Sequence, residues 1–225
     1  MTTVAFALLL CLLDDNAADE AIQVFRNAMK SPEVSVRTAA VAELGKVQNA
    51  KVLKVLAACL NIDDKAVRIQ AADALGHFKV KKPQVCGVLS EALDMNSRVP
   101  EVQIALLKAL KDLQEEAALA ASGRFMDDKN PKVAESAIEI TGVVRSRASI
   151  EPLIKLMKKL THSGEGYSSG DGSLDVPADE QLRQRARQLQ SAAGKALQSI
   201  TGEKWGTVEE WEAWWKKNSS TFRVK

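Results

Sequence analysis

The chain has 225 residues, of which 46% are hydrophobic, 27% charged and only 4% aromatic. This hydrophobic fraction excludes disorder for most of the chain. The net charge of +2 is too small for a protein specialised in nucleic-acid binding. All the Trp residues lie within 205–225. Residues 17–200 therefore have a core of Ala, Leu, Val and Ile, which favours closely packed helices over sheets.

The N-terminal segment 1–16 contains an apolar run at residues 4–13. The run is too short to span a bilayer, and it is apolar on every side. Two interpretations stay open for 1–16: the apolar region of a secretory signal peptide, or an extra buried helix. The absence of Lys and Arg before the run argues against the signal peptide. On balance the segment favours an exported or periplasmic location over a cytoplasmic one.

A repeat follows, most clearly where residues 31–47 align with residues 63–78 at a constant offset of 31. The shared pattern is a marker Val, an Arg directly after it, and then Ala, Leu and Gly at fixed distances. In the two copies these are Val36, Arg37, Ala40, Leu44 and Gly45, and Val67, Arg68, Ala71, Leu75 and Gly76. Less regular copies follow at 101–112 and 130–142, with the marker positions Val102 and Val133.

Each copy is predicted to be the second helix of a pair. The apolar residues at the marker Val and four and eight positions later form one helical stripe. Residues suited to helix N-caps or first turns precede each copy, namely Ser31-Pro32, Asp63-Asp64, Asn96-Ser97 and Asn130-Pro131. First helices are predicted at 17–29, 49–60, 82–93 and 115–126, and a fifth pair at 148–160 and 180–200. Such pairs become stable by stacking on one another.

The segments VRTAAVAELG and VRIQAADALG resemble the HEAT repeat, in its short bacterial form of the phycocyanin-lyase type. The period also overlaps that of ankyrin and tetratricopeptide repeats, but their signature motifs are absent. The resemblance implies an all-α fold: a right-handed α-α superhelix (a HEAT/armadillo-like solenoid) of about five helix pairs over 17–200, with a capping helix in 201–225. It implies a binding scaffold and no particular reaction.

Arg37 and Arg68 are predicted to be structural, reaching acidic cap residues such as Asp63 or Asp64 in an adjacent turn.

Each cysteine, Cys11, Cys59 and Cys86, lies in an apolar run and is predicted to be a buried free thiol. A Cys59–Cys86 disulfide is the alternative. No Cys or His spacing suits a metal, and His77 is expected to face solvent.

A segment rich in Gly and Ser at 161–179 interrupts the fifth pair. It is predicted to be a surface loop. A partner-binding loop acting through Tyr167 is one functional interpretation. The spacing of Asp171, Ser173 and Asp175 is that of a calcium loop, but the turn Gly and the bidentate Glu are missing. A tolerated insertion is the third interpretation.

The tail 201–225 is predicted to contain a helix that begins at Thr207, with Glu210 completing a capping box. Trp211, Trp214 and Trp215 then share one helical face. We expect these residues to close the apolar end of the stack, as terminal repeats require. A sugar-binding platform and a membrane-surface patch are the alternatives.

The sequence contains no catalytic, cofactor-binding or metal-binding motif, and an enzyme is not expected. The face that second helices present in HEAT stacks carries charges of both signs at Asp73, His77, Lys108, Asp112 and Glu139. These residues are candidates for binding a protein or peptide, although an ordinary solvated face would look the same.

The expected function is a non-enzymatic interaction scaffold. The alternative is an accessory subunit or enzyme of the chromophore-lyase or HEAT-like DNA glycosylase type, which a continuous basic groove with an exposed aromatic would favour. The identity of the partner and the oligomeric state stay open.

Overall fold

The computed structural model describes residues 2–164 and 180–224, with side chains described for 15–161 and 180–224. The described residues form eleven α-helices and one short 3-10 helix, and they contain no strand. The predicted all-helical repeat fold is therefore confirmed. The chain divides into two compact units, Met1–Glu115 and Glu116–Lys225.

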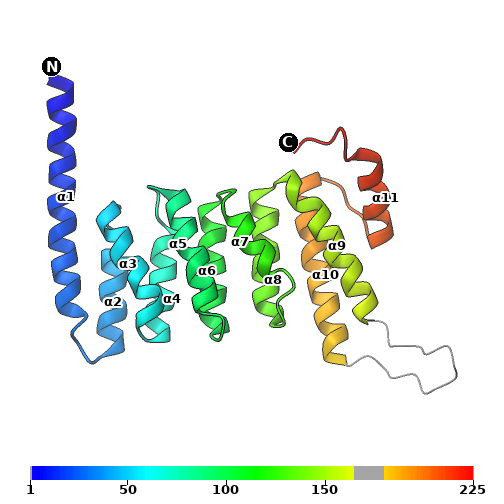
Figure 1. The fold of residues 1–225 in the computed structure, drawn as a ribbon, viewed down its shortest axis with the longest axis horizontal. Coiled ribbons are helices and arrows are strands. Elements are labelled where there is room, and N and C mark those ends of the chain that lie inside the picture. The colour runs from blue at the N-terminus through cyan, green and yellow to red at the C-terminus, as the bar shows by residue number, and fades with distance from the viewer. Residues whose placement is uncertain (1, 165–179, 225) are drawn as a thin grey trace. The chain divides into compact units, whose positions relative to one another are not determined.

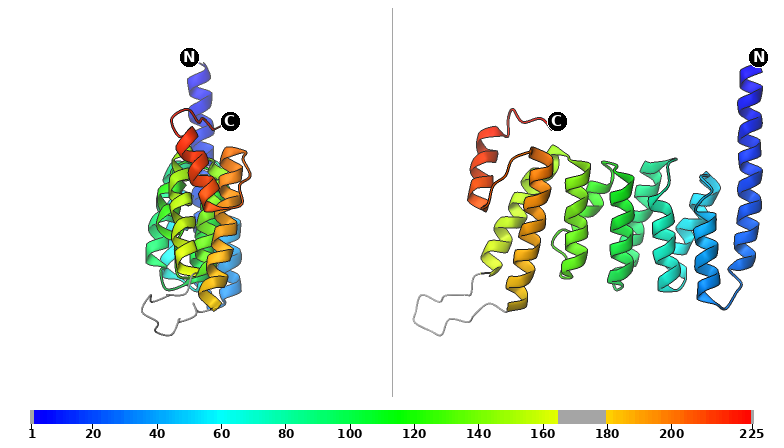
Figure 2. Two further views of the ribbon diagram at one scale, coloured as in Figure 1. Left: turned by 90° about the vertical axis from the view of Figure 1, so that its right-hand side faces the viewer. Right: turned by 180° about the vertical axis from the view of Figure 1, so that it is seen from behind.

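The first unit consists of three helix pairs arranged in two layers (Figure 1). Its helices are α1 (Thr2–Ala28), α2 (Val34–Leu44), α3 (Ala50–Ile62), α4 (Lys65–Gly76), α5 (Lys82–Met95) and α6 (Pro100–Leu113). The first helices α1, α3 and α5 contact one another in sequence, and so do the second helices α2, α4 and α6. The right-hand view of Figure 2, seen from behind, shows the same order of these helices. We call these the first-helix layer and the second-helix layer.

Helix α1 is continuous from Thr2 to Ala28, so it runs through both the 1–16 segment and the helix predicted at 17–29. The side chains of the apolar run at 4–13, including Cys11, lie outside the described residues. In the part that is described, Ala18, Ile22 and Phe25 form the buried stripe of α1. Their spacing of four and three residues is the one that places side chains on a single helical face.

The predicted apolar stripe is the core of the second-helix layer. In α4 the stripe residues Val67, Ala71 and Leu75 are each 0% exposed. The marker residue of α2 differs, because Val36 is 42% exposed. Helix α2 stands at the end of the second-helix layer of this unit. Its neighbour in that layer is α4, which covers one side of α2. Its N-terminal half is therefore less covered than that of α4.

The glycine that ends the repeat pattern allows neighbouring second helices to approach closely. A Cβ atom built at Gly45 would lie 2.6 Å from the Cβ of Ala74 on α4. A Cβ atom at Gly76 would lie 2.9 Å from the Cα of Ala109 on α6. Both distances are shorter than carbon atoms tolerate, so these positions need a residue without a side chain.

Replacing Gly76 with Ala is expected to lower the free energy of unfolding by about 1 kcal/mol, because overpacking against α6 outweighs the gain in helix propensity. Gly87 of α5 is the matched control, since a Cβ atom there meets nothing within 4 Å. Gly87→Ala should raise the free energy of unfolding by about 0.5–1 kcal/mol. Urea denaturation measures both. Two changes of the same sign would contradict the close approach of α4 and α6.

The second unit contains α7 (Ala118–Phe125), α8 (Pro131–Val144), the 3-10 helix η1 (Arg147–Ser149), α9 (Ile150–Gly164), α10 (Glu180–Thr201) and α11 (Val208–Asn218). Helices α7 and α8 form one pair, and α9 and α10 form the next. The second helices α8 and α10 pack together, and Gly142 of α8 faces Ala196 of α10. Helix α11 packs on the first helix α9. The predicted loop at 161–179 begins later than expected, because α9 continues to Gly164. Tyr167 and the calcium spacing of Asp171, Ser173 and Asp175 lie outside the described residues.

Two of the four predicted N-caps are wrong. Asp64 and Asn130 do cap α4 and α8, each accepting a hydrogen bond from a backbone N–H two residues later. Helices α2 and α6 begin later than predicted, after Glu33 and Val99, neither of which makes a side-chain cap. Asn96 does not cap α6, because its Oδ1, which would accept the capping bond, accepts from Arg68, while its Nδ2 donates to the carbonyls of Leu60 and Ala92.

Candidate functional site

Three of the predicted partner-binding residues form one exposed cluster on the second-helix layer of the first unit. Asp73 lies in the last turn of α4, His77 follows directly after Gly76 as the C-cap of α4, and Lys108 lies on the neighbouring helix α6. The Lys108 Nζ is 3.6 Å from the Asp73 Oδ1, and the His77 Nδ1 is 4.0 Å from the Asp73 Oδ2. The side chain of Lys108 is 61% exposed, that of Asp73 43% and that of His77 68%.

Asp112 is exposed and follows Lys108 by one turn of α6. We call Asp73, His77, Lys108 and Asp112 the second-helix patch. Glu139 is exposed on α8 of the second unit, so it is not grouped with them. Tyr167 lies outside the described residues. The structure thus brings together the residues predicted on α4 and α6.

Arg37 ties two turns of the first unit together. Its guanidinium donates hydrogen bonds to both carboxylate oxygens of Asp63, at 2.9–3.2 Å, and to the carbonyls of Ser31 and Pro32. Burial by itself raises the pKa of Asp63, but hydrogen bonds from Arg37 and the Asp64 amide outweigh it, so this pKa lies below its ordinary value. Asp63 is therefore charged at neutral pH and held in place.

Arg68 occupies the same position in the next repeat but bonds to an amide. Its Nη1 donates to the Oδ1 of Asn96 at 2.7 Å rather than to an acidic cap. The reason is that each Arg reaches forward to the following turn, where the second repeat has Asn96 in place of Asp63. Asn96 in turn donates to the Leu60 carbonyl at 3.1 Å. Both arginines thus connect adjacent repeats, and neither faces an open site.

The second unit contains an equivalent clamp at the turn between α7 and α8. Arg185 of α10 donates to the Asp127 carboxylate at 2.9 Å and to the Asp128 carbonyl at 2.7 Å. Lys159 of α9 also donates to the Asp127 carboxylate. Burial raises the pKa of Asp127, but these two cations lower it further than burial raises it. The clamp joins three helices of the unit and fixes the position of α10.

Helix α11 begins with the predicted capping box, since Thr207 and Glu210 exchange hydrogen bonds between side chain and backbone. Trp211 is 1% exposed, and Trp214 and Trp215 are half-buried. Trp214 and Trp215 stack with ring centroids 6.0 Å apart, and Phe222 packs edge-on against Trp214 at 5.5 Å. The aromatic face of α11 is thus largely occupied by contacts within the unit.

The described cysteines are buried free thiols, which excludes the Cys59–Cys86 disulfide. Burial raises the pKa of Cys59 and of Cys86 to about 11, so both are protonated at neutral pH. Within residues whose side chains are described, no group of three His, Cys, Asp or Glu could hold a metal ion. Across the described helices, none is both long and apolar enough to span a bilayer.

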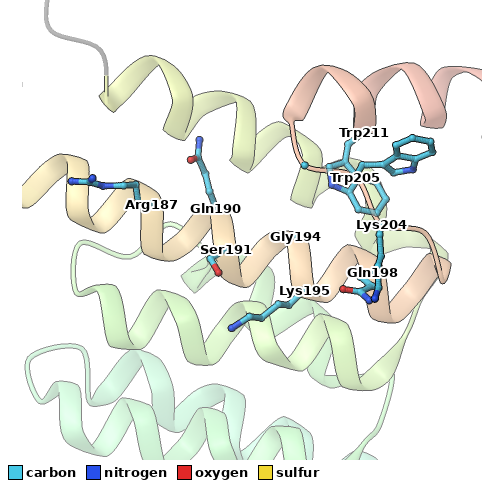
Figure 3. A pocket seen from close by; sticks show the side chains of 10 residues that line it. Arg187, Gln190, Ser191, Gly194, Lys195, Gln198, Lys204, Trp205 and Trp211 are labelled. Carbon is cyan, nitrogen blue, oxygen red and sulfur yellow. The ribbon is translucent and has the colours of Figure 1, made fainter.

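Sequence reasoning missed a groove of about 500 Å³ in the second unit, which we call the α10 groove. Figure 3 shows Arg187, Gln190, Ser191, Lys195 and Gln198 following one another along α10. Lys204, Trp205, Gly206 and Trp211 line the end of the groove. Three of the lining residues are cations and none is an acid. The helical register of the fifth second helix could have identified the residues on α10, but not those from the tail.

Comparison with known proteins gives one family match. A family model described as HEAT repeats matches residues 4–76 and, in a second overlapping match, residues 22–99. The two matches together run from α1 to just beyond the end of α5. No curated protein matches the chain.

Proposed function

The chain is a HEAT-repeat protein, and we propose that it is a non-enzymatic scaffold or adaptor that binds a protein partner through its second-helix patch. HEAT repeats form helical scaffolds that typically mediate protein interactions, because stacked helices offer an extended surface. The short bacterial, phycocyanin-lyase-like form of the repeat remains part of this proposal.

The observation that carries the proposal is the ion pair between Asp73 and Lys108. It joins neighbouring second helices on their exposed side, and His77 extends it by one turn. An exposed pair of this kind adds little to stability, since water and salt screen it. It does place a fixed pattern of both charge signs on a rigid surface, which is what selects a protein partner by electrostatic complementarity.

One observation favours the alternative function. The α10 groove combines Arg187, Lys195 and Lys204 with Trp205, which is 40% exposed. An enzyme of the DNA glycosylase type needs a carboxylate in such a groove, as well as cations and an aromatic. None of the residues lining the α10 groove is Asp or Glu. The scaffold is therefore the better supported function.

Affinity capture with the full chain as bait tests the proposal. A variant with Asp73, Lys108 and His77 changed to Ala should recover at least tenfold less of any partner that the unaltered chain captures. The matched control is a double Ala variant at Asp19 and Lys51, an exposed ion pair at 2.7 Å between first helices α1 and α3. Equal recovery by the patch variant and the control variant would refute the assignment of the surface.

A further inference from the structure

The outer edge of α10 corresponds to the edge of α4 that receives the next second helix. Ala74 of α4 meets Gly45 of the preceding second helix, and Ala196 of α10 meets Gly142 in the same way. Ala196 follows Ala74 by 122 positions. The same offset maps the stripe Val67, Ala71 and Leu75 onto Leu189, Ala193 and Leu197, and all six are 0% exposed. The two helices therefore share one register.

In this register, the positions of α4 on the edge next to α6 correspond to positions of α10 that line the α10 groove. On α4, Lys65 pairs with Glu101 of α6 at 2.8 Å, Asp73 pairs with Lys108 at 3.6 Å, and Gly76 meets Ala109. The positions Lys65, Ile69, Ala72, Asp73 and Gly76 correspond to Arg187, Ser191, Gly194, Lys195 and Gln198, and all five of the latter line the groove. The groove is thus the place where a further second helix would sit.

At this end of the second unit α11 packs on the first helix α9, and among the described helices only α8 and α9 pack closely on α10. Helix α11 packs on α9, as α5 packs on α3 in the first unit. The segment that leads from α10 to α11 contributes Lys204, Trp205 and Gly206 to the far side of the groove. Helix α11 therefore takes the position of a first helix beside α9, and no described helix takes the second-helix position beside the α10 groove.

The charges of the groove define what could occupy it. On α4 the corresponding edge carries one cation and one anion, Lys65 and Asp73, and each is paired with α6. On α10 both positions are cationic. The Arg187 guanidinium forms an ion pair with the Glu180 carboxylate, with 2.7 Å between Nη2 and Oε1. Lys195 and Lys204 form no ion pair with any residue of the described parts of the chain. An occupant would need carboxylates.

We infer that the α10 groove binds an acidic amphipathic helix of a partner protein, which takes the position that a next second helix would hold beside α10. On α6 the residues that pair with α4 are seven apart, Glu101 and Lys108. The partner helix therefore presents carboxylates seven residues apart to Arg187 and Lys195. Gln198 takes the position of Gly76, so this helix stands further from α10 at that end, where Trp205 provides the apolar contact. This inference rests on the proposed scaffold function and adds a second binding surface to it.

A second copy of the chain fits the groove less well. Within the first unit, α2 has a free edge in the second-helix layer, because α4 is the second helix that it contacts. In the register of the marker Val, Ser35 and Ala42 of α2 correspond to Glu101 and Lys108 of α6. Neither residue is acidic, so α2 lacks the charges that Arg187 and Lys195 require. The acidic helix of a different protein is the occupant that the groove favours.

A synthetic peptide provides the test. The probe is an 18-residue Ala-rich helix with Glu at positions 5 and 12, Leu on the same face, and a fluorescein label. Fluorescence anisotropy with the full chain should give a dissociation constant below about 100 μM. Lys195→Glu should raise it at least tenfold, and added salt should weaken binding, because the charges at the groove are exposed. Lys132→Glu, an exposed position of α8 outside the groove, makes the same charge change and should leave binding unaltered.

Three further measurements can overturn the inference. A peptide with Pro in the middle cannot form the helix and should not bind; equal binding would mean that the occupant is not helical. A twelve-residue oligo-thymidine that binds more tightly than the peptide would make the groove a nucleic-acid site. Sedimentation showing that the chain alone self-associates, with Lys195→Glu abolishing the association, would make the occupant a second copy. The patch variant should bind the peptide normally, so failure of this inference is distinguishable from failure of the scaffold proposal.

Discussion

Replacing Trp211 with Ala is expected to lower the free energy of unfolding of the unit that contains it by about 3–5 kcal/mol. Trp211 is among the largest fully buried side chains, at 1% exposure. Its truncation would leave a cavity beneath α11 and would loosen the docking of α11 on α9. The indole Nε1 has no hydrogen-bond partner, so the loss comes from packing rather than from a broken hydrogen bond.

Urea denaturation followed by circular dichroism measures this effect. Trp205→Ala is the matched control, because that side chain is 40% exposed and should cost far less. Trp211→Phe should fall between the two, since it keeps much of the buried apolar surface and removes only an unpartnered donor. A loss below about 1 kcal/mol for Trp211→Ala would mean that α11 does not close the apolar end of its unit.

Replacing Asp63 with Ala is expected to lower the free energy of unfolding by about 1–3 kcal/mol, the second largest effect. The change leaves Arg37 partly buried without its carboxylate, and both side chains of the pair are less than one-fifth exposed at present. Asp19→Ala removes an exposed pair and should change the free energy far less. Equal losses for the two variants would show that the Arg37–Asp63 bridge is not a structural tie.

The same pair makes stability depend on pH in a stated direction. The pKa of Asp63 is lower in the folded chain than in the unfolded chain. The stabilisation it provides is therefore fully present above the unfolded value of about 3.9, and it is lost as the pH falls through the folded value. Asp127 contributes with the same sign. Urea titrations from pH 6 to pH 2.5 should show a smaller decline for Asp63→Ala than for the unaltered chain.

The helical repeat could be predicted from the sequence because its constraint is local. A Val, Ala and Leu spaced four apart must share one helical face, and in α4 they are the fully buried residues. The glycine at the end of the pattern was identified as part of the repeat, whereas its role in the close approach of neighbouring helices comes from the contacts around Gly45 and Gly76. These features depend on spacing within one helix or between equivalent positions.

The features that sequence reasoning missed depend on contacts between distant residues. The sequence predicts Asn96 as an N-cap, but in the structure its Nδ2 donates to the Leu60 carbonyl and its Oδ1 accepts from Arg68. The α10 groove was hidden because Leu189 and Gln190 replace the Val-Arg marker in the fifth second helix. Its remaining wall comes from Lys204 and Trp205, which reach α10 only after the chain turns into α11. No local pattern relates those tail residues to α10.

Hydrogen–deuterium exchange of the full chain, with and without the protein that it captures, tests the central claim most directly. If the chain is a scaffold that binds through its second helices, bound partner should slow exchange in peptides from α4 and α6, with additional slowing in α10 if the groove is also occupied. Peptides from α3 and α5 of the first-helix layer should exchange at unchanged rates. Slower exchange confined to α3 and α5, with α4, α6 and α10 unaffected, would contradict the account.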